Sequence, residues 1–132
     1  MEIHRLTDAI SVAAQISAGD VPAIRDAGFR ALLCNRPDRE SPGQPDFSEI
    51  ESAARAAGLE IRYQPVVSGR MNLSDVQAFA QAVGELPGPV LAYCRSGTRC
   101  TRLWALSQHG RMPAAEIVAT ARMAGYDVGD LV

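Results

Sequence analysis

The chain has 132 residues, with 13 basic and 15 acidic side chains and a formal net charge of -2 at pH 7. This length allows one compact domain with a proper core and is too short for two ordinary domains. The arginines are scattered among acidic residues, so neither a basic stripe for nucleic acid nor a polybasic helix for a membrane surface is present. We therefore expect a single domain over residues 1–132 that handles small anions or protein thiols.

The N-terminal region and the cysteines indicate the cellular compartment in which the protein is expected. Asp8 lies near the N-terminus and no apolar run reaches a spanning length, so we expect neither a signal peptide nor a transmembrane helix. The three cysteines lack the spacing of a disulfide framework or a zinc site, because no Cys-x-x-Cys or His-x-x-x-His pair exists. The sequence predicts a cytoplasmic protein that needs no metal or organic cofactor.

Strands and helices are expected to alternate along the chain. Ser17, Asp46 and Ser74 each begin a four-residue segment that resembles an N-terminal capping sequence. Alternating elements of this kind predict a three-layer α/β/α fold with a mainly parallel sheet. In chain order the expected elements are a strand at 10–16, a helix at 21–27, a strand at 29–34, a helix at 46–57, a strand at 59–67, a helix from 74, a strand ending at 93, a helix to 109, and a helix from 113 to about 124.

The loops after three strands should form one site. In open parallel sheets, ligands bind outside the carboxyl ends of the strands, so the loops after Cys34, Val67 and Tyr93 are expected at one rim. These loops contribute the following residues: Asn35, Arg36, Asp38, Arg39 and Glu40 from the first, Ser68, Gly69 and Arg70 from the second, and Cys94 to Arg99 from the third.

The segment CRSGTR begins at Cys94, directly after an apolar run and directly before a helical pattern. A strand that leads through a glycine-containing turn into a helix points backbone N–H groups and the positive end of the helix dipole at one place, where a cysteine thiol loses its proton easily. Arg95 and Arg99 add positive charge. We expect Cys94 to be a nucleophilic thiolate with a lowered pKa, and Ser96, Gly97 and Thr98 to help bind an anion.

The length of this loop favours sulfur chemistry. A cysteine, a short loop and a closing arginine are shared by the tyrosine phosphatase and rhodanese families, and phosphatases place five residues between the two. Here four residues separate Cys94 from Arg99, so the segment resembles a single-domain rhodanese loop. A shorter ring of N–H groups leaves less room for a phosphate ester and enough for the terminal sulfur of a persulfide.

Several stretches together resemble one particular family. AISVAAQIS, AGFRALLCNRPD, Gln64-Pro65-Val66 and GPVLAYCRSGTR are similar to the phosphatase-like domain found in beta-lactamase hydrolase-like proteins and beside persulfide dioxygenases, over about residues 3–109. The resemblance implies a fold of the tyrosine-phosphatase or dual-specificity phosphatase type, with phosphatase or sulfurtransferase activity. It also implies that Cys94 is the nucleophile and that Arg95 and Arg99 bind the anion.

Two departures from the phosphatase pattern weigh against ester hydrolysis. Dual-specificity phosphatases carry a general-acid aspartate in the loop that corresponds to residues 66–70, and this loop has no carboxylate here. They also place a Ser or Thr directly after the closing arginine, where this chain has Cys100. Asp38 is a candidate substitute acid, although a turn role is favoured for it. Arg36 is a candidate contact at the rim.

The favoured function is a sulfurtransferase, in which Cys94 takes sulfane sulfur from thiosulfate or glutathione persulfide and passes it to a thiol acceptor. A partner such as a persulfide dioxygenase could receive that sulfur. The alternative is a cysteine-dependent phosphatase that forms a Cys94 phosphoenzyme, and a third class is an inactive anion or persulfide carrier. Cys34 and Cys100 are expected to be buried structural residues.

Overall fold

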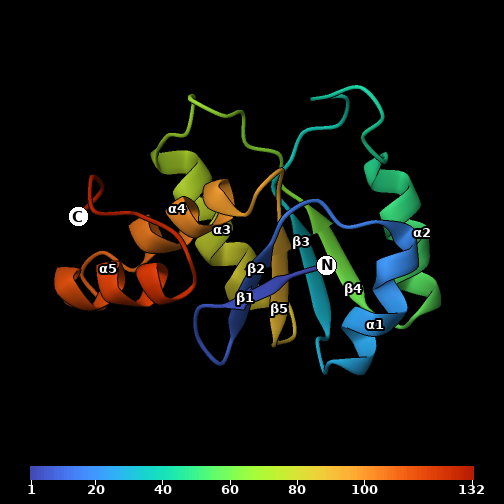
Figure 1. Cartoon of the computed structure of the whole chain (residues 1–132), viewed down its shortest axis with the longest axis horizontal. Coiled ribbons are helices and arrows are strands. Elements are labelled where there is room, and N and C mark those ends of the chain that lie inside the picture. Colours follow the sequence, from blue (N-terminus) through green and yellow to red (C-terminus); the bar gives the residue numbers. More distant parts are fainter.

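The computed structural model describes residues 1–132, and its centre is a five-stranded sheet in the order β1-β2-β5-β3-β4 (Figure 1). The strands β2, β5, β3 and β4 are parallel, and β1 pairs antiparallel with β2. The strands are β1 Ile3–Arg5, β2 Ile10–Ala13, β3 Ala31–Cys34, β4 Glu60–Tyr63 and β5 Val90–Tyr93.

Helices cover both faces of the sheet, so the predicted three-layer architecture is confirmed. The neighbouring residues Leu32 and Leu33 in β3 point to opposite faces and belong to two separate core clusters. One cluster contains buried residues of α1 and α2, and the other contains buried residues of α3, α4 and α5. The helices are α1 Val21–Asp26, α2 Phe47–Ala56, α3 Leu73–Glu85, α4 Thr98–Ser107 and α5 Ala114–Met123, and a 3-10 turn at Ala18–Asp20 precedes α1.

The strands are shorter than the apolar runs predict, and β1 was not predicted at all. Strand β4 ends at Tyr63, before the end of the predicted run 59–67. Beyond it, the Gln64 N–H donates to the carbonyl of Cys34, the last residue of β3, and the Val66 N–H donates to the carbonyl of Asn35 in the loop that follows. The strand β1 has only three residues, none of them fully buried, so it lacks the apolar pattern that would reveal it.

Two helices, α2 and α3, are capped by other residues than the sequence predicts. Asn72 caps α3, two residues before the predicted Ser74, because its side chain accepts from the Asp75 N–H at 3.1 Å while the Asp75 carboxylate accepts from the Asn72 N–H at 3.0 Å. Asp46 occupies the N-cap position of α2 but makes no capping bond with its side chain. The Asp38 carboxylate accepts from the first N–H of that helix instead, at 2.8 Å from Phe47 N.

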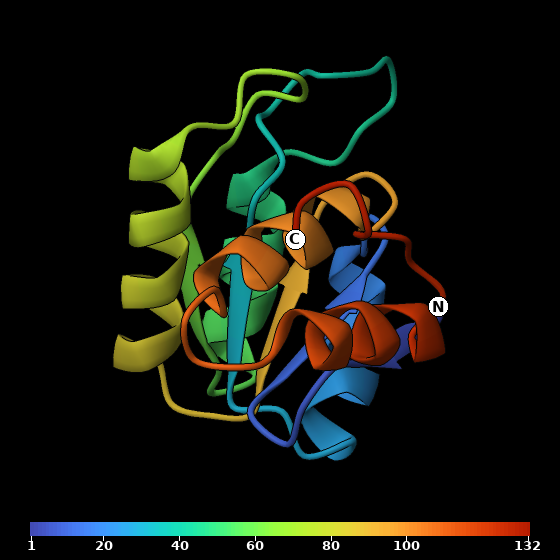
Figure 2. The same ribbon diagram turned by 90° about the vertical axis from the view of Figure 1, so that its left-hand side faces the viewer.

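The loops that follow β3 and β4 project from the same edge of the sheet, where β5 also ends (Figures 1 and 2). This edge is the rim at which the sequence places the functional loops, and it is formed because parallel strands carry their carboxyl ends on one side. No helix of the chain is both long and apolar enough to cross a membrane.

Candidate active site

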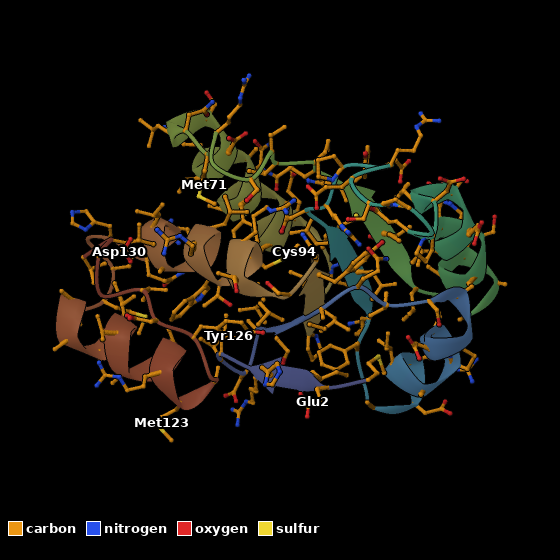
Figure 3. The ribbon with its side chains drawn as sticks, turned by 45° about the horizontal axis from the view of Figure 1, so that its top comes forward. Glu2, Met71, Cys94, Met123, Tyr126 and Asp130 are labelled. Atoms are coloured by element: carbon orange, nitrogen blue, oxygen red, sulfur yellow. The ribbon has the colours of Figure 1, made fainter.

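Cys94 lies at the end of β5, buried at the start of the turn into α4 (Figure 3). The Gly97 N–H donates to Cys94 Sγ at 3.1 Å. Gly97 adopts a left-handed backbone with φ of 88°, which allows the chain to curl around the sulfur before the helix begins at Thr98. The turn therefore directs the Gly97 N–H at the sulfur.

The surroundings of Cys94 lower its pKa to about 5. The largest cause is a hydrogen bond from the Cys100 thiol, and burial opposes it; the backbone N–H groups of Cys100, Ser96 and Gly97 add to the lowering. A thiol with this pKa is a thiolate at neutral pH. The predicted direction is confirmed, and the backbone N–H groups of the turn contribute to it as expected, but the charges of Arg95 and Arg99 are not among the leading causes.

Cys100 has a role that its pattern did not reveal. It is fully buried in the core cluster that contains Leu103 and Trp104, as expected. Burial also raises its pKa well above the ordinary value, so it keeps the proton that it donates to Cys94. Cys100 thus supplies a donor at the position where phosphatases carry a Ser or Thr hydroxyl. Cys34 is buried as predicted, and burial raises its pKa too.

Arg99 joins the three loops at the rim. Its Nη1 donates to the Val66 carbonyl at 2.9 Å and to the Asn35 carbonyl at 3.4 Å, and its Nη2 donates to Glu40 Oε1 at 3.0 Å. The Nε of Arg99 is buried and has no hydrogen-bond partner. Because an unpaired buried donor is costly, this N–H is a candidate donor to an anion held by the turn.

Glu40 holds two arginines in place. It accepts from Arg36 Nε at 3.0 Å as well as from Arg99, and both guanidinium groups are buried. Partial burial alone would raise the pKa of Glu40, but the hydrogen bonds from Arg99 and Arg36 outweigh it and hold the pKa below its ordinary value. Glu40 is therefore a carboxylate at neutral pH, and it positions Arg99.

Arg36 does not reach the cleft as a rim contact, and Asp38 has the structural role in the loop that the sequence favoured for it rather than the role of an acid. Arg36 Nη1 donates to the Gln15 side chain at 3.1 Å and Nη2 donates to the Ser41 hydroxyl at 3.1 Å, so all three nitrogens of this guanidinium have partners within the protein. The Asp38 carboxylate binds the first turn of α2. Neither residue lines the cleft in front of Cys94.

A cleft of about 1090 Å³ opens in front of Cys94. All three predicted loops contribute to it: Glu40 follows β3, Ser68 and Gly69 follow β4, and the turn after β5 provides Cys94 with its neighbours. Gly97, also in this turn, does not line the cleft; its N–H donates to the Cys94 sulfur. The remaining lining residues are Val67, Met71, Asn72, Leu73, Val76, Arg95, Ser96, Thr98, Arg99, Arg102, Leu106, His109 and Leu131.

The C-terminal segment supports the turn from behind. The Tyr126 hydroxyl donates to the Ser96 carbonyl at 3.1 Å, and a Cβ added at Gly97 would overlap that hydroxyl. Nothing in the local sequence around Tyr126 indicates this contact, because 30 residues separate it from Ser96.

The chain belongs to the family described as "Beta-lactamase hydrolase-like protein, phosphatase-like domain", whose pattern matches residues 2–111. It is 34% identical over 130 residues to a beta-lactamase hydrolase-like protein of Agrobacterium fabrum, a match that covers 97% of this chain and 30% of that protein. A relative from Xylella fastidiosa is also 34% identical, over the whole of this chain and 31% of its own length. The chain thus spans about a third of the length of these relatives.

Solved structures show the same fold. A candidate phosphatase from Neisseria meningitidis is 37% identical and superimposes with a TM-score of 0.89, covering 98% of this chain and 93% of that one. The core catalytic domain of a PP-IP phosphatase from S. cerevisiae has a TM-score of 0.68 at 13% identity, covering 93% of this chain and 75% of that one. The expected family and the phosphatase-like α/β fold are therefore confirmed.

Proposed function

We propose, from the membership of this phosphatase-like family, that the chain is a cysteine-dependent phosphatase that acts through a Cys94 phosphoenzyme. The observation that carries the proposal is the Cys94 thiolate, which three backbone N–H groups and the Cys100 thiol stabilise at the end of β5. The free Nε of Arg99 adds a donor for a bound phosphoryl group. Cysteine nucleophiles with a lowered pKa are activated in this way.

The reaction would proceed in two steps. The Cys94 sulfur attacks the phosphorus atom, an S–P bond forms, and the bond from phosphorus to the leaving oxygen breaks. Water then attacks the phosphocysteine, which releases inorganic phosphate and restores the thiolate. Arg99, which Glu40 orients, and the N–H groups of the turn would stabilise the charge of the equatorial phosphoryl oxygens.

Sulfur transfer is the second candidate, and the four-residue loop between Cys94 and Arg99 favours it. In that reaction the same thiolate would take sulfane sulfur from thiosulfate or glutathione persulfide. The family and the solved structures support the phosphatase over this function, which the loop length and the two departures from the phosphatase pattern favour. Sulfur donors and a persulfide dioxygenase partner stay predictions from the sequence.

Parallel assays distinguish the two reactions. Hydrolysis of nitrophenyl phosphate should be measured beside thiocyanate formation from thiosulfate and cyanide, with Cys94→Ser as the control in both. The phosphatase proposal expects ester hydrolysis that disappears in the variant, and a phosphorylated Cys94 peptide after acid quenching. Thiocyanate formation with a Cys94 persulfide and no ester hydrolysis would replace the proposal with the sulfurtransferase.

A further inference from the structure

We infer that the cleft selects phosphoryl compounds whose leaving group is apolar and weakly basic, so that it departs without receiving a proton. The shared chemistry is that of an acyl phosphate with an apolar chain or a phosphate ester of an electron-poor phenol. The inference rests on the proposed phosphatase function and adds the substrate class to it. Two separate properties of the cleft carry it.

The first property is the lack of a carboxylic acid that could protonate a leaving group. Glu40 is the only carboxyl group among the residues that line the cleft, and it accepts hydrogen bonds from Arg36 and Arg99. It is therefore held as a carboxylate and has no proton to give. Asp38, the acid suggested by the sequence, is bound to the N-terminus of α2 and lies outside the lining.

The other polar groups of the cleft do not replace this acid. His109 lies ten residues beyond Arg99, about 15 Å away at 1.5 Å per helical residue, and so does not reach the oxygen that leaves the phosphorus atom at the turn. Arginine side chains stay protonated at all relevant pH values. The hydroxyl groups near the turn belong to Ser96 and Thr98, which hydrogen-bond to each other at 3.0 Å and are too weakly acidic for this task.

The second property is an apolar wall continuous with the catalytic turn. Val67 and Leu73 are large hydrophobic side chains that are 54% and 71% exposed, and both line the cleft. Met71 lies between them in the sequence, on the loop before α3, and also lines the cleft. Apolar side chains also come from α3, α4 and the C-terminal segment, and they are Val76, Leu106 and Leu131.

The charges of the cleft are concentrated at its catalytic end. Arg102 lies on the wall but is held by Asp130 through two hydrogen bonds of 3.2 and 2.8 Å, so its charge is offset. Arg99 is similarly paired with Glu40, while Arg95 beside the thiolate has no carboxylate partner. A single phosphoryl group at the turn and an uncharged apolar body along the wall match this distribution.

The chemistry balances without a proton donor. The Cys94 thiolate forms the S–P bond, and the electron pair of the breaking P–O bond leaves on oxygen as a carboxylate or phenolate. In the second step water supplies one oxygen and both of its hydrogens to the phosphate, and the P–S electron pair returns to sulfur. Substrates with strongly basic alkoxide leaving groups, such as phosphoserine, would need the acid that the cleft lacks.

The test for the missing acid is a series of aryl phosphates with leaving phenols of increasing pKa, with phosphoserine as the alkyl member. We expect kcat/KM to fall by roughly threefold to tenfold for each unit of leaving-group pKa, and phosphoserine not to react. Ser68→Asp, which places a carboxyl group on the cleft loop after β4, should make this dependence shallower. Equal rates for alkyl and aryl esters would overturn the inference while leaving the phosphatase function intact.

The test for the apolar wall compares octanoyl phosphate with acetyl phosphate. Octanoyl phosphate should have a kcat/KM at least several-fold higher, and Leu73→Glu should remove most of that preference. Met123→Glu is the matched control, because Met123 is 91% exposed on α5 and lies outside the cleft (Figure 3). No preference for the longer chain would overturn the inference, and a failure to hydrolyse any phosphoryl compound would remove the phosphatase function itself. Whichever of octanoyl phosphate and nitrophenyl phosphate has the higher kcat/KM shows whether the preferred substrates are acyl phosphates or aryl phosphates.

Discussion

Cys100→Ala tests how the protein produces the Cys94 thiolate. The Cys100 thiol is the largest cause of the lowered pKa of Cys94, which the folded protein holds at about 5. A hydrogen bond to a charged group contributes about 1.5–3 kcal/mol, and one pKa unit corresponds to about 1.36 kcal/mol. Removing this donor should therefore raise the pKa of Cys94 by about 1 to 2, while the backbone N–H groups keep it below that of a free thiol.

The measurement is the rate of alkylation of Cys94 by iodoacetamide as a function of pH, followed by peptide mapping. Cys34 and Cys100 should react little, because burial raises the pKa of both. Between pH 5 and 6 the variant should react several-fold more slowly than the wild type, and near pH 8 the two rates should converge. These differences in rate follow only from the fraction of Cys94 that is ionised at each pH.

Cys100→Ser is the matched control, because a hydroxyl can donate to the sulfur from the same position. Its alkylation profile should stay close to that of the wild type. If the alanine variant titrates at the wild-type pH, the thiol of Cys100 contributes nothing and the backbone donors alone lower the pKa. If serine and alanine shift the profile equally, the effect comes from packing and the reasoning is wrong.

Three further predictions follow from the same site. Glu40→Gln should lower kcat/KM by up to about 100-fold, because Arg99 loses the carboxylate that orients it; wild-type kinetics would contradict this role. Gly97→Ala should lower both Tm and activity, since the added Cβ meets the Tyr126 hydroxyl in a left-handed backbone, and an unchanged Tm would refute the steric argument. The thiolate of Cys94 should stabilise the fold above about pH 8.5 and lose that effect as pH falls toward 5, so the free energy of unfolding of Cys94→Ala, relative to wild type, should rise on acidification. Denaturant titration at several pH values measures this difference.

The pattern of strands and helices and the position of the catalytic turn could be predicted from the sequence because their signals are local. Hydrophobic periodicity lies within each element and glycine stops lie at its end, and the strand, turn and helix around Cys94 form one consecutive segment, residues 90–107. The parallel order of the strands then places three loops at one rim, as predicted. The short strand β1 could not be predicted in this way, because its three partly exposed residues show no clear alternation of apolar and polar side chains.

The partners of individual side chains were decided only by the tertiary structure. Asp38 and Glu40 lie two residues apart in one polar loop, yet one caps α2 and the other binds Arg99, 59 residues away. Local sequence does not determine which partner each of these carboxylates binds, because the partner depends on how the loop backbone packs against distant strands. Cys100 shows the same limit: helical spacing predicts its burial, but it does not predict that its thiol donates to the Cys94 sulfur. Burial follows from local periodicity, whereas a hydrogen bond requires the three-dimensional positions of both partners.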